Sequence, residues 1–235
     1  MKRGIDISYA QGGVDFMRLK GRTDFVIIRA GYGSLASQKD EYFEQNYKEC
    51  RRLKIPCGAY WFSYARNAAE AKQEAQACIS VIKGKRFEYP IYYDVEGEAL
   101  QGGRDTVSEM CRCFCDTLER AGYFAGIYMS ADPLETLLTP EVRKRYALWV
   151  AEYGGRLSYS GFVGMWQNSS SGRLNGIVGS VDTDLCYEDY PTIIKKAHLN
   201  GYKRRDKKKK HKKVFGGALF LKKGLRGRTQ SSKLD

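Results

Sequence analysis

The sequence predicts an α/β fold in which about eight short apolar strands alternate with helices and close into a TIM-like (β/α) barrel. Two observations support this prediction. The strand candidates are near-continuous apolar runs, which are typical of a parallel sheet buried on both faces. Helical patterns separate the first several strands, whereas loops alone separate the last few, so some late helices are missing from the predicted barrel. A chain of 235 residues, 43% of them hydrophobic, is long enough for one such domain.

The elements follow from local patterns. The residue spacing of Phe43, Tyr47 and Cys50 gives one apolar helical face, and Asn67 and Gly84 are a suitable N-cap and stop for the next helix. The predicted helices are residues 40–53, 67–83 and 105–122. The predicted strands are residues 4–8, 24–30, 56–64, a segment within 89–98, 125–130, 145–151, 162–167 and 179–185.

Positive charge is concentrated at the end of the chain. Residues 203–235 contain 14 Lys or Arg and two Asp, whereas residues 1–202 contain 26 basic and 25 acidic residues. Of the net charge of +13, the tail therefore carries +12 and residues 1–202 only +1, so the overall charge indicates nothing about the folded body. We expect a barrel over residues 1–195 and a basic tail, predicted to be disordered, over residues 196–235.

Histidine and cysteine usage excludes several chemistries. Both histidines, His198 and His211, lie at or beyond the end of the predicted barrel, which argues against histidine triads and histidine-ligated metals. The seven cysteines lack the spacing of a disulfide framework. Residues 111–115 place three of them on a predicted helix, and we expect free, mostly buried thiols rather than zinc ligands.

Two carboxylates follow the apolar strand within residues 89–98. Asp94 and Glu96 are two residues apart, so on an extended strand they point the same way, roughly 6.5–7 Å apart at the backbone. Two carboxylates at this distance repel each other, and the repulsion drives the pKa values of the two carboxyl groups apart. One carboxyl can then stay protonated and donate a proton while its neighbour stays ionised.

Other polar and aromatic residues also lie on or just after predicted strands. Barrels of this type carry their active sites at the carboxyl ends of the strands. Acids and amides that bind hydroxyl groups, together with flat rings that stack on sugars, are what a sugar-binding cleft requires. For each ring alone, ordinary core packing is the alternative. The residues are Asp6, Tyr32, Tyr60, Tyr64, Asp94, Glu96, Tyr128, Glu152, Tyr153, Trp166, Gln167 and Asp182.

Eight short motifs over about residues 3–190 occur in an order that closely resembles glycoside hydrolase family 25, the Chalaropsis-type lysozymes (N-acetylmuramidases). The motifs are Gly4-Ile-Asp6-Ile-Ser8, Phe25-Val-Ile-Ile-Arg-Ala-Gly-Tyr32-Gly, Gly58-Ala-Tyr60-Trp-Phe, Asp94-Val-Glu96, Gly126-Ile-Tyr128, Leu148-Trp-Val-Ala151, Trp166-Gln167 and Gly176-Ile with Val181-Asp182.

The resemblance implies a partly degenerate barrel that hydrolyses the β-1,4 bond between N-acetylmuramic acid and N-acetylglucosamine in peptidoglycan, without a cofactor. Phage endolysins and bacterial autolysins both use this domain. The family's acidic residues carry over to Asp6, Asp94, Glu96 and Asp182.

The resemblance and the residue chemistry together suggest roles. Glu96 is the expected general acid. Asp94 is either a nucleophile or the group that stabilises an intermediate formed by the substrate's own acetamido group, while Asp6 and Asp182 orient substrate or tune the pair. The expected sugar contacts are Tyr32, Tyr60, Tyr128, Trp166 and Gln167.

Alternatives remain open at this stage. The alternatives to a muramidase are a non-catalytic glycan-binding module, a hydrolase of another amino-sugar polymer such as chitin, and a nucleic-acid-binding protein. The near-neutral body argues against nucleic acid. The run at residues 203–213 favours adhesion to anionic wall polymers or a membrane surface, if it has a function.

The predicted place of action is the bacterial cell wall. No apolar secretory segment follows Met1, so we expect a product that is made in the cytoplasm and is released either in the manner of a phage product or by another route without a signal peptide. We also expect a monomer. Phage and bacterial origin both fit.

Overall fold

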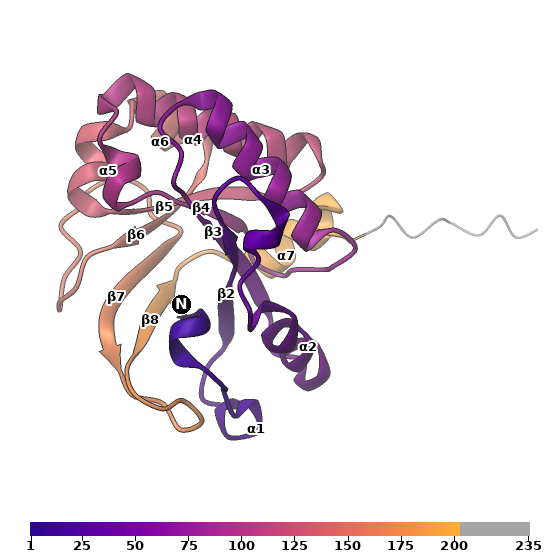
Figure 1. Cartoon of the computed structure of the whole chain (residues 1–235). Coiled ribbons are helices and arrows are strands. Elements are labelled where there is room, and N and C mark those ends of the chain that lie inside the picture. Colours follow the sequence, from indigo (N-terminus) through magenta and orange to yellow (C-terminus); the bar gives the residue numbers. More distant parts are fainter. Residues whose placement is uncertain (203–235) are drawn as a thin grey trace, which may run out of the picture. The chain divides into compact units, whose positions relative to one another are not determined.

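Eight strands form a closed barrel in chain order in the computed structural model, which describes residues 1–202 (Figure 1). The predicted barrel is therefore confirmed. The strands are β1 (Lys2–Ile7), β2 (Phe25–Tyr32), β3 (Cys57–Phe62), β4 (Ile91–Asp94), β5 (Ala125–Ser130), β6 (Ala147–Ala151), β7 (Met165–Gly172) and β8 (Val181–Cys186).

Helices cover the outside of much of the barrel. The three predicted helices are present, and α1, α5, α6 and α7 are additional to them. The helices are α1 (Phe16–Leu19), α2 (Phe43–Leu53), α3 (Ala68–Ile82), α4 (Gly103–Arg120), α5 (Ala131–Leu137), α6 (Pro140–Arg145) and α7 (Tyr190–Ala197), with short 3₁₀ turns η1 (Tyr9–Gln11), η2 (Ala36–Gln38) and η3 (Gly97–Leu100). Figure 1 shows α3 to α6 on one side of the barrel and the β7–β8 hairpin on the other, without a helix over it.

The sequence predicts a parallel sheet, and for β8 this is wrong. β8 runs antiparallel to both of its neighbours, β1 and β7, while the other pairs are parallel. Only residues 173–180 connect β7 to β8, and a parallel return requires a crossover of a dozen or more residues. Because β8 is reversed, its first residues lie at the end of the barrel where β1 to β7 finish.

Strand alternation divides the core into two parts. One buried cluster outside the barrel includes Val26, Ile28, Tyr93 and Ile127 and packs against the helices. A second cluster fills the barrel interior with larger rings, among them Phe25, Tyr60, Tyr92, Tyr128 and Trp149. The interior positions of the same strands, nearer the mouth, carry the polar residues of the candidate site.

The folded body continues past the boundary at residue 195 that the sequence predicts. α7 ends at Ala197, and Asn200 is fully buried. The Asn200 side chain accepts a hydrogen bond from the Phe124 N–H at 2.7 Å and donates one to the Tyr89 carbonyl at 2.8 Å. These bonds attach the end of the folded body to the segments that lead into β4 and β5. The predicted basic run at residues 203–213 lies outside the described residues.

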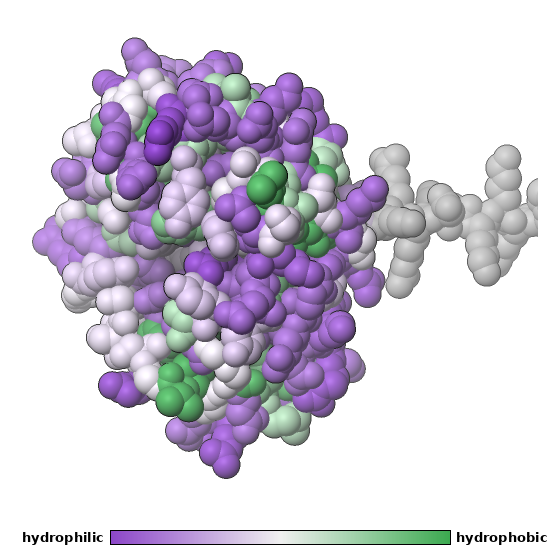
Figure 2. All heavy atoms as spheres, viewed as in Figure 1, coloured by the Kyte–Doolittle hydropathy of each residue, from purple (hydrophilic) through white to green (hydrophobic). Residues whose placement is uncertain are grey.

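The surface in the view of Figure 1 is mostly hydrophilic. Figure 2 shows only small, separate hydrophobic patches on this face. Within residues 1–202, no helix combines the length and the apolar character that crossing a bilayer requires.

Candidate active site

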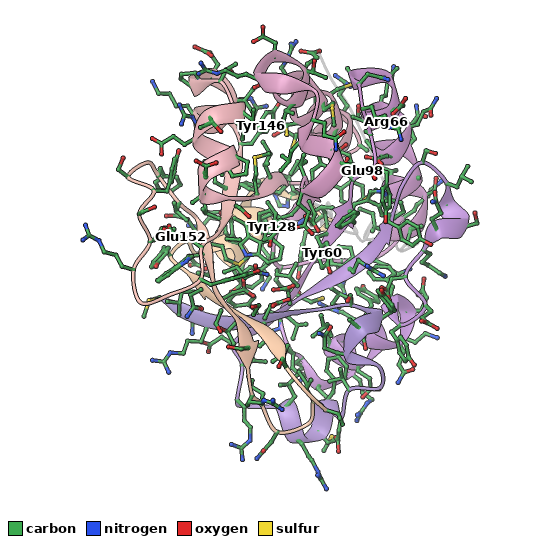
Figure 3. The ribbon with its side chains drawn as sticks, turned by 60° about the vertical axis from the view of Figure 1, so that its left-hand side comes forward. Tyr60, Arg66, Glu98, Tyr128, Tyr146 and Glu152 are labelled. Atoms are coloured by element: carbon green, nitrogen blue, oxygen red, sulfur yellow. The ribbon has the colours of Figure 1, made fainter. Side chains whose placement is uncertain are left out.

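The barrel interior gathers most of the predicted site residues at one mouth. Asp6 at the end of β1 is the direct partner of Asp182 at the start of β8, and Asp94 at the end of β4 is the partner of Tyr128 on β5. Side chains of alternate residues share a face, so Tyr60 on β3 and Gln167 on β7 point inward as well. Figure 3 shows Tyr60 and Tyr128 at the middle of the barrel.

Gln167 connects this group by hydrogen bonds. Its Oε1 accepts from the hydroxyl groups of Tyr128 at 2.8 Å and Tyr153 at 3.1 Å, and its Nε2 donates to Asp6 Oδ2 at 2.8 Å. The two phenols fix which end of the amide faces Asp6. Gln167 is also buried. Its amide group therefore orients Asp6 and is not free to turn toward a ligand.

Asp94 is the most unusual carboxyl of the site. The residue is only 5% exposed, and none of the described residues donates a hydrogen bond to its buried Oδ1. Burial, and then the charge of Glu96, raise the pKa of Asp94 well above its ordinary value, while the Arg29 guanidinium opposes this shift. An unpaired buried oxygen is costly to folding, which indicates that Asp94 is retained for another purpose.

Glu96 lies beyond the end of β4, closer to solvent than Asp94. The strand ends at Asp94, but the backbone at Glu96 is still extended, with φ −148° and ψ 175°. The side chain is half-buried, and burial followed by the charge of Asp182 raises the pKa of Glu96. A half-buried acid with a raised pKa can hold its proton until a bound substrate accepts it.

The sequence reasoning missed a fifth carboxyl, Asp184. It follows Asp182 by two residues on β8, so both face the barrel interior, and Trp149 Nε1 donates a hydrogen bond to Asp184 Oδ1 at 2.8 Å. Burial raises the pKa of Asp6 well above its ordinary value, and the charge of Asp182 adds to this shift. The two-residue spacing that singled out Asp94 and Glu96 could have identified Asp184 in the same way.

A cavity of about 610 Å³ lies beside this group of acids, at the ends of β2 and β3. Arg29 Nε donates to Asp40 Oδ2 at 2.7 Å, and its guanidinium lies 4.4 Å from the centre of the Tyr9 ring. The acids inside the barrel mouth do not line this cavity. Arg29 links the two regions, because it lines the cavity and also lowers the pKa of Asp94. The lining residues are Tyr9, Arg29, Tyr32, Lys39, Asp40, Glu41, Phe62 and Tyr64.

Of these cavity residues, the sequence reasoning identified Tyr32 as a sugar contact and placed Tyr64 among the aromatic residues at the strand ends. The exposed rings of Tyr9 and Tyr64 lie at the opening of the cavity. The Tyr32 and Tyr64 rings pack edge to face, with their centres 5.9 Å apart. Flat rings around a polar floor suit the binding of a sugar or another amphipathic group. Arg29 and Asp40 gave no signal because their pairing depends on how the loop after β2 folds back onto that strand.

Comparison with known proteins agrees with this geometry. A family model described as glycosyl hydrolases family 25 matches residues 5–177, more than half of the chain. The chain belongs to this family.

Relatives of this family 25 chain include an autolytic lysozyme and an autolysin. It is 31% identical over 188 residues to the autolytic lysozyme of Clostridium acetobutylicum, an alignment that covers 77% of this chain and 55% of that protein. Among solved structures, the autolysin LytC of Streptococcus pneumoniae with a synthetic peptidoglycan ligand matches with a TM-score of 0.71 and 33% identity, over 79% of this chain and 46% of that one. The chain thus spans about half the length of these two relatives.

A third match is close in size to this family 25 domain. The catalytic domain of the endolysin ply40 from bacteriophage P40 of Listeria monocytogenes has a TM-score of 0.69 and 25% identity. The match covers 83% of this chain and 97% of that domain. What this chain has in common with longer relatives is therefore a domain of this size.

Trp166 is the predicted sugar contact that the family 25 fold does not bring to the acids. Its neighbours Met165 and Gln167 face the barrel interior, so alternation along β7 turns Trp166 to the opposite face. There it is buried, and its Nε1 donates to the Glu152 carbonyl at 2.7 Å. Trp166 supports the loop between β6 and β7, and this loop carries Tyr153.

Glu152 also stays away from the acids. Its carboxylate accepts a hydrogen bond from the Ser158 N–H at 2.6 Å, and hydrogen bonds from Ser158 lower its pKa. Figure 3 shows Glu152 on the loop to one side of the barrel, while Glu98 and Arg66 lie at the other side. Its neighbour Tyr153 is the residue of this pair that reaches the site, through Gln167.

The cysteines do not contribute to the site. All seven are free, and all but Cys113 are buried, as the sequence predicts. Within residues 1–202, no group of three or more His, Cys, Asp or Glu side chains is arranged to hold a metal ion.

Proposed function

We propose that this domain hydrolyses the β-1,4 bond between N-acetylmuramic acid and N-acetylglucosamine in peptidoglycan, with Glu96 as the proton donor. The observation that carries the proposal is the pairing at the end of β4. A half-buried acid with a raised pKa lies just above a fully buried carboxyl with an unpaired oxygen. Two carboxyl groups in such different surroundings can divide the work of glycoside hydrolysis.

Glu96 would act on the leaving group. Its protonated carboxyl donates to the glycosidic oxygen as the bond to the anomeric carbon breaks, and its carboxylate then takes a proton from the attacking water. The negative charge of Asp182 supports the protonated form of Glu96 before the reaction. Glu96 is able to alternate between the two forms because it is only half-buried.

Asp94 would act on the positive charge that develops at the anomeric carbon. Its carboxylate either bonds to that carbon as a nucleophile or stabilises the intermediate formed by the substrate's acetamido group. Arg29 lowers the pKa of Asp94 and so favours the ionised form that both roles require. Below these acids, Gln167 donates a hydrogen bond to Asp6, and the buried Tyr60 lies close to Asp6 and Asp94.

Peptidoglycan as the substrate is supported by the relatives. The structure of LytC that this chain matches contains a synthetic peptidoglycan ligand, and the curated relative is an autolytic lysozyme. The exposed rings of Tyr9 and Tyr64 offer flat surfaces at the opening of the cavity for a sugar chain. The cell wall is then the proposed place of action, and adhesion of residues 203–213 to anionic wall polymers stays a prediction.

Product analysis tests this proposal. The full chain is incubated with purified peptidoglycan and, separately, with chitin, and soluble fragments are reduced and analysed by mass spectrometry. We expect peptidoglycan fragments whose new reducing end is N-acetylmuramic acid, with no fragments from chitin. Fragments ending in N-acetylglucosamine, or faster release from chitin, would assign a different substrate bond.

A further inference from the structure

Asp184 occupies the barrel interior directly below the mouth. It is paired with Gln167 on β7 and with Gly4 on β1, and it is only 1% exposed. Its Oδ1 accepts the Trp149 hydrogen bond, whereas its buried Oδ2 receives no hydrogen bond from any part of the chain that the structure describes. Half of this carboxyl group is therefore satisfied and half is not.

The groups that face Asp184 are acids or neutral side chains. Asp6 lies on β1, Asp182 and Cys186 on β8, and Tyr92 on β4. β6 and β7 present only uncharged side chains toward it, those of Trp149, Met165 and Gln167. No cation is among these neighbours within residues 1–202, so an ionised Asp184 would be a buried charge without a partner.

Such a charge is strongly unfavourable in a protein interior. Burial, and then the charge of Asp182, raise the pKa of Asp184 well above its ordinary value, although the Trp149 hydrogen bond opposes the shift. A neutral carboxyl keeps a carbonyl oxygen for Trp149 and removes the unfavourable charge. The geometry and the charge distribution therefore favour the same protonation state.

Trp149 connects Asp184 to the catalytic group. The Trp149 ring packs edge to face on Tyr128 at 4.5 Å, and the Tyr128 hydroxyl donates to Gln167, which donates to Asp6. Rings of Tyr60 and Tyr92 lie 6.1 and 5.1 Å from the same indole. An acceptor at position 184 thus fixes the indole on which this floor is built.

We propose that Asp184 is a positioning residue that stays a neutral carboxylic acid at working pH and anchors Trp149 beneath the catalytic acids. Because it is neutral, the negative charge that acts on Glu96 comes from Asp182 and not from Asp184. The protonation state concerns the folded protein alone, and only the kinetic part of the test rests on the proposed function.

Infrared difference spectroscopy tests the protonation state without a substrate. The spectrum of the full chain at neutral pH is compared with that of Asp184→Asn, which has nearly the same shape and cannot ionise. We expect the parent protein to show the carbonyl stretch of a protonated carboxyl that the variant lacks. A difference spectrum with only carboxylate bands lost in the variant would overturn the proposal.

Kinetics test the positioning role. Asp184→Ala removes the acceptor for Trp149 and should lower the turnover of peptidoglycan about tenfold, while Asp184→Asn should recover it to within about threefold of the parent because an amide oxygen still accepts. The alkaline limb of the pH profile should not move in Asp184→Asn. An Asn variant as impaired as the Ala variant, or a limb displaced by about one pH unit, would contradict the proposal.

The two readouts separate the possible failures. If the parent protein releases no sugar from peptidoglycan, the proposed function fails and the infrared result still decides the state of Asp184. If Asp184→Ala does not fold, the Asn variant and the infrared comparison remain decisive.

Discussion

Replacing Glu96 by glutamine should lower the turnover of peptidoglycan by about 10²–10⁴-fold, the range that a positioned general acid supplies. Glutamine keeps the shape of the side chain, but its amide cannot give up a proton to the leaving oxygen. The measurement is the rate at which reducing ends appear from purified peptidoglycan. Circular dichroism and thermal unfolding of Glu96→Gln should show an intact barrel, because the half-buried Glu96 side chain accepts no cap hydrogen bond.

Glu98→Gln is the matched control for this experiment. Glu98 lies two residues further along in η3, its side chain is 70% exposed, and its ion pair with Arg66 spans 3.9 Å. Exposed pairs of this kind contribute little, so the rate should stay within about twofold of the parent. A folded Glu96→Gln protein that works as fast as Glu98→Gln would remove Glu96 from the role of proton donor.

Replacing Asp94 by asparagine should lower turnover by about 10²-fold or more and at the same time raise stability at neutral pH. The rate falls because an amide can neither bond to the anomeric carbon nor balance positive charge there. Stability rises because the pKa of Asp94 is raised in the folded protein, so its ionisation opposes folding. An acid with a raised folded pKa loses stability as pH increases from its unfolded pKa, and asparagine avoids this loss.

Turnover and melting temperature are measured together for this variant at pH 4 and pH 7. The gain in melting temperature should be larger at pH 7. At that pH the carboxyl of Asp94 is ionised in the unfolded parent chain, and its raised pKa in the folded protein then costs the most stability. Asp105→Asn is a suitable control, since Asp105 is exposed in α4 and its change should alter stability by at most about 0.5 kcal/mol. A loss of melting temperature in Asp94→Asn at both pH values would show that Asp94 is structural.

The periodicity of the sequence was sufficient to predict the barrel and most of its polar mouth. Alternation along a strand gives the inward face, so Asp6, Asp94, Tyr128 and Gln167 could be identified one strand at a time. Helices α5 and α6 gave a weaker signal because each is short and contains a proline. Local patterns therefore identify faces and strand ends well.

Contacts between distant strands could not be predicted in this way. Asp6 and Asp182 lie at opposite ends of the domain sequence and become partners only because the barrel closes between β1 and β8. The direction of β8 depends on the hairpin, and the apolar pattern of a strand is the same in either direction. The pairing of Arg29 with Asp40 is more local, but it depends on how the loop after β2 folds back onto that strand, which the apolar pattern does not indicate.

The central claim is that Glu96 is a proton donor whose acid form is supported by the charge of Asp182. The most direct test is the pH dependence of kcat/KM on soluble peptidoglycan fragments for the parent protein and for Asp182→Asn. The charge of Asp182 raises the pKa of Glu96, so its removal lowers that pKa and should move the alkaline limb to lower pH, whatever the change in maximal rate. An alkaline limb at the same pH in both proteins would contradict the account.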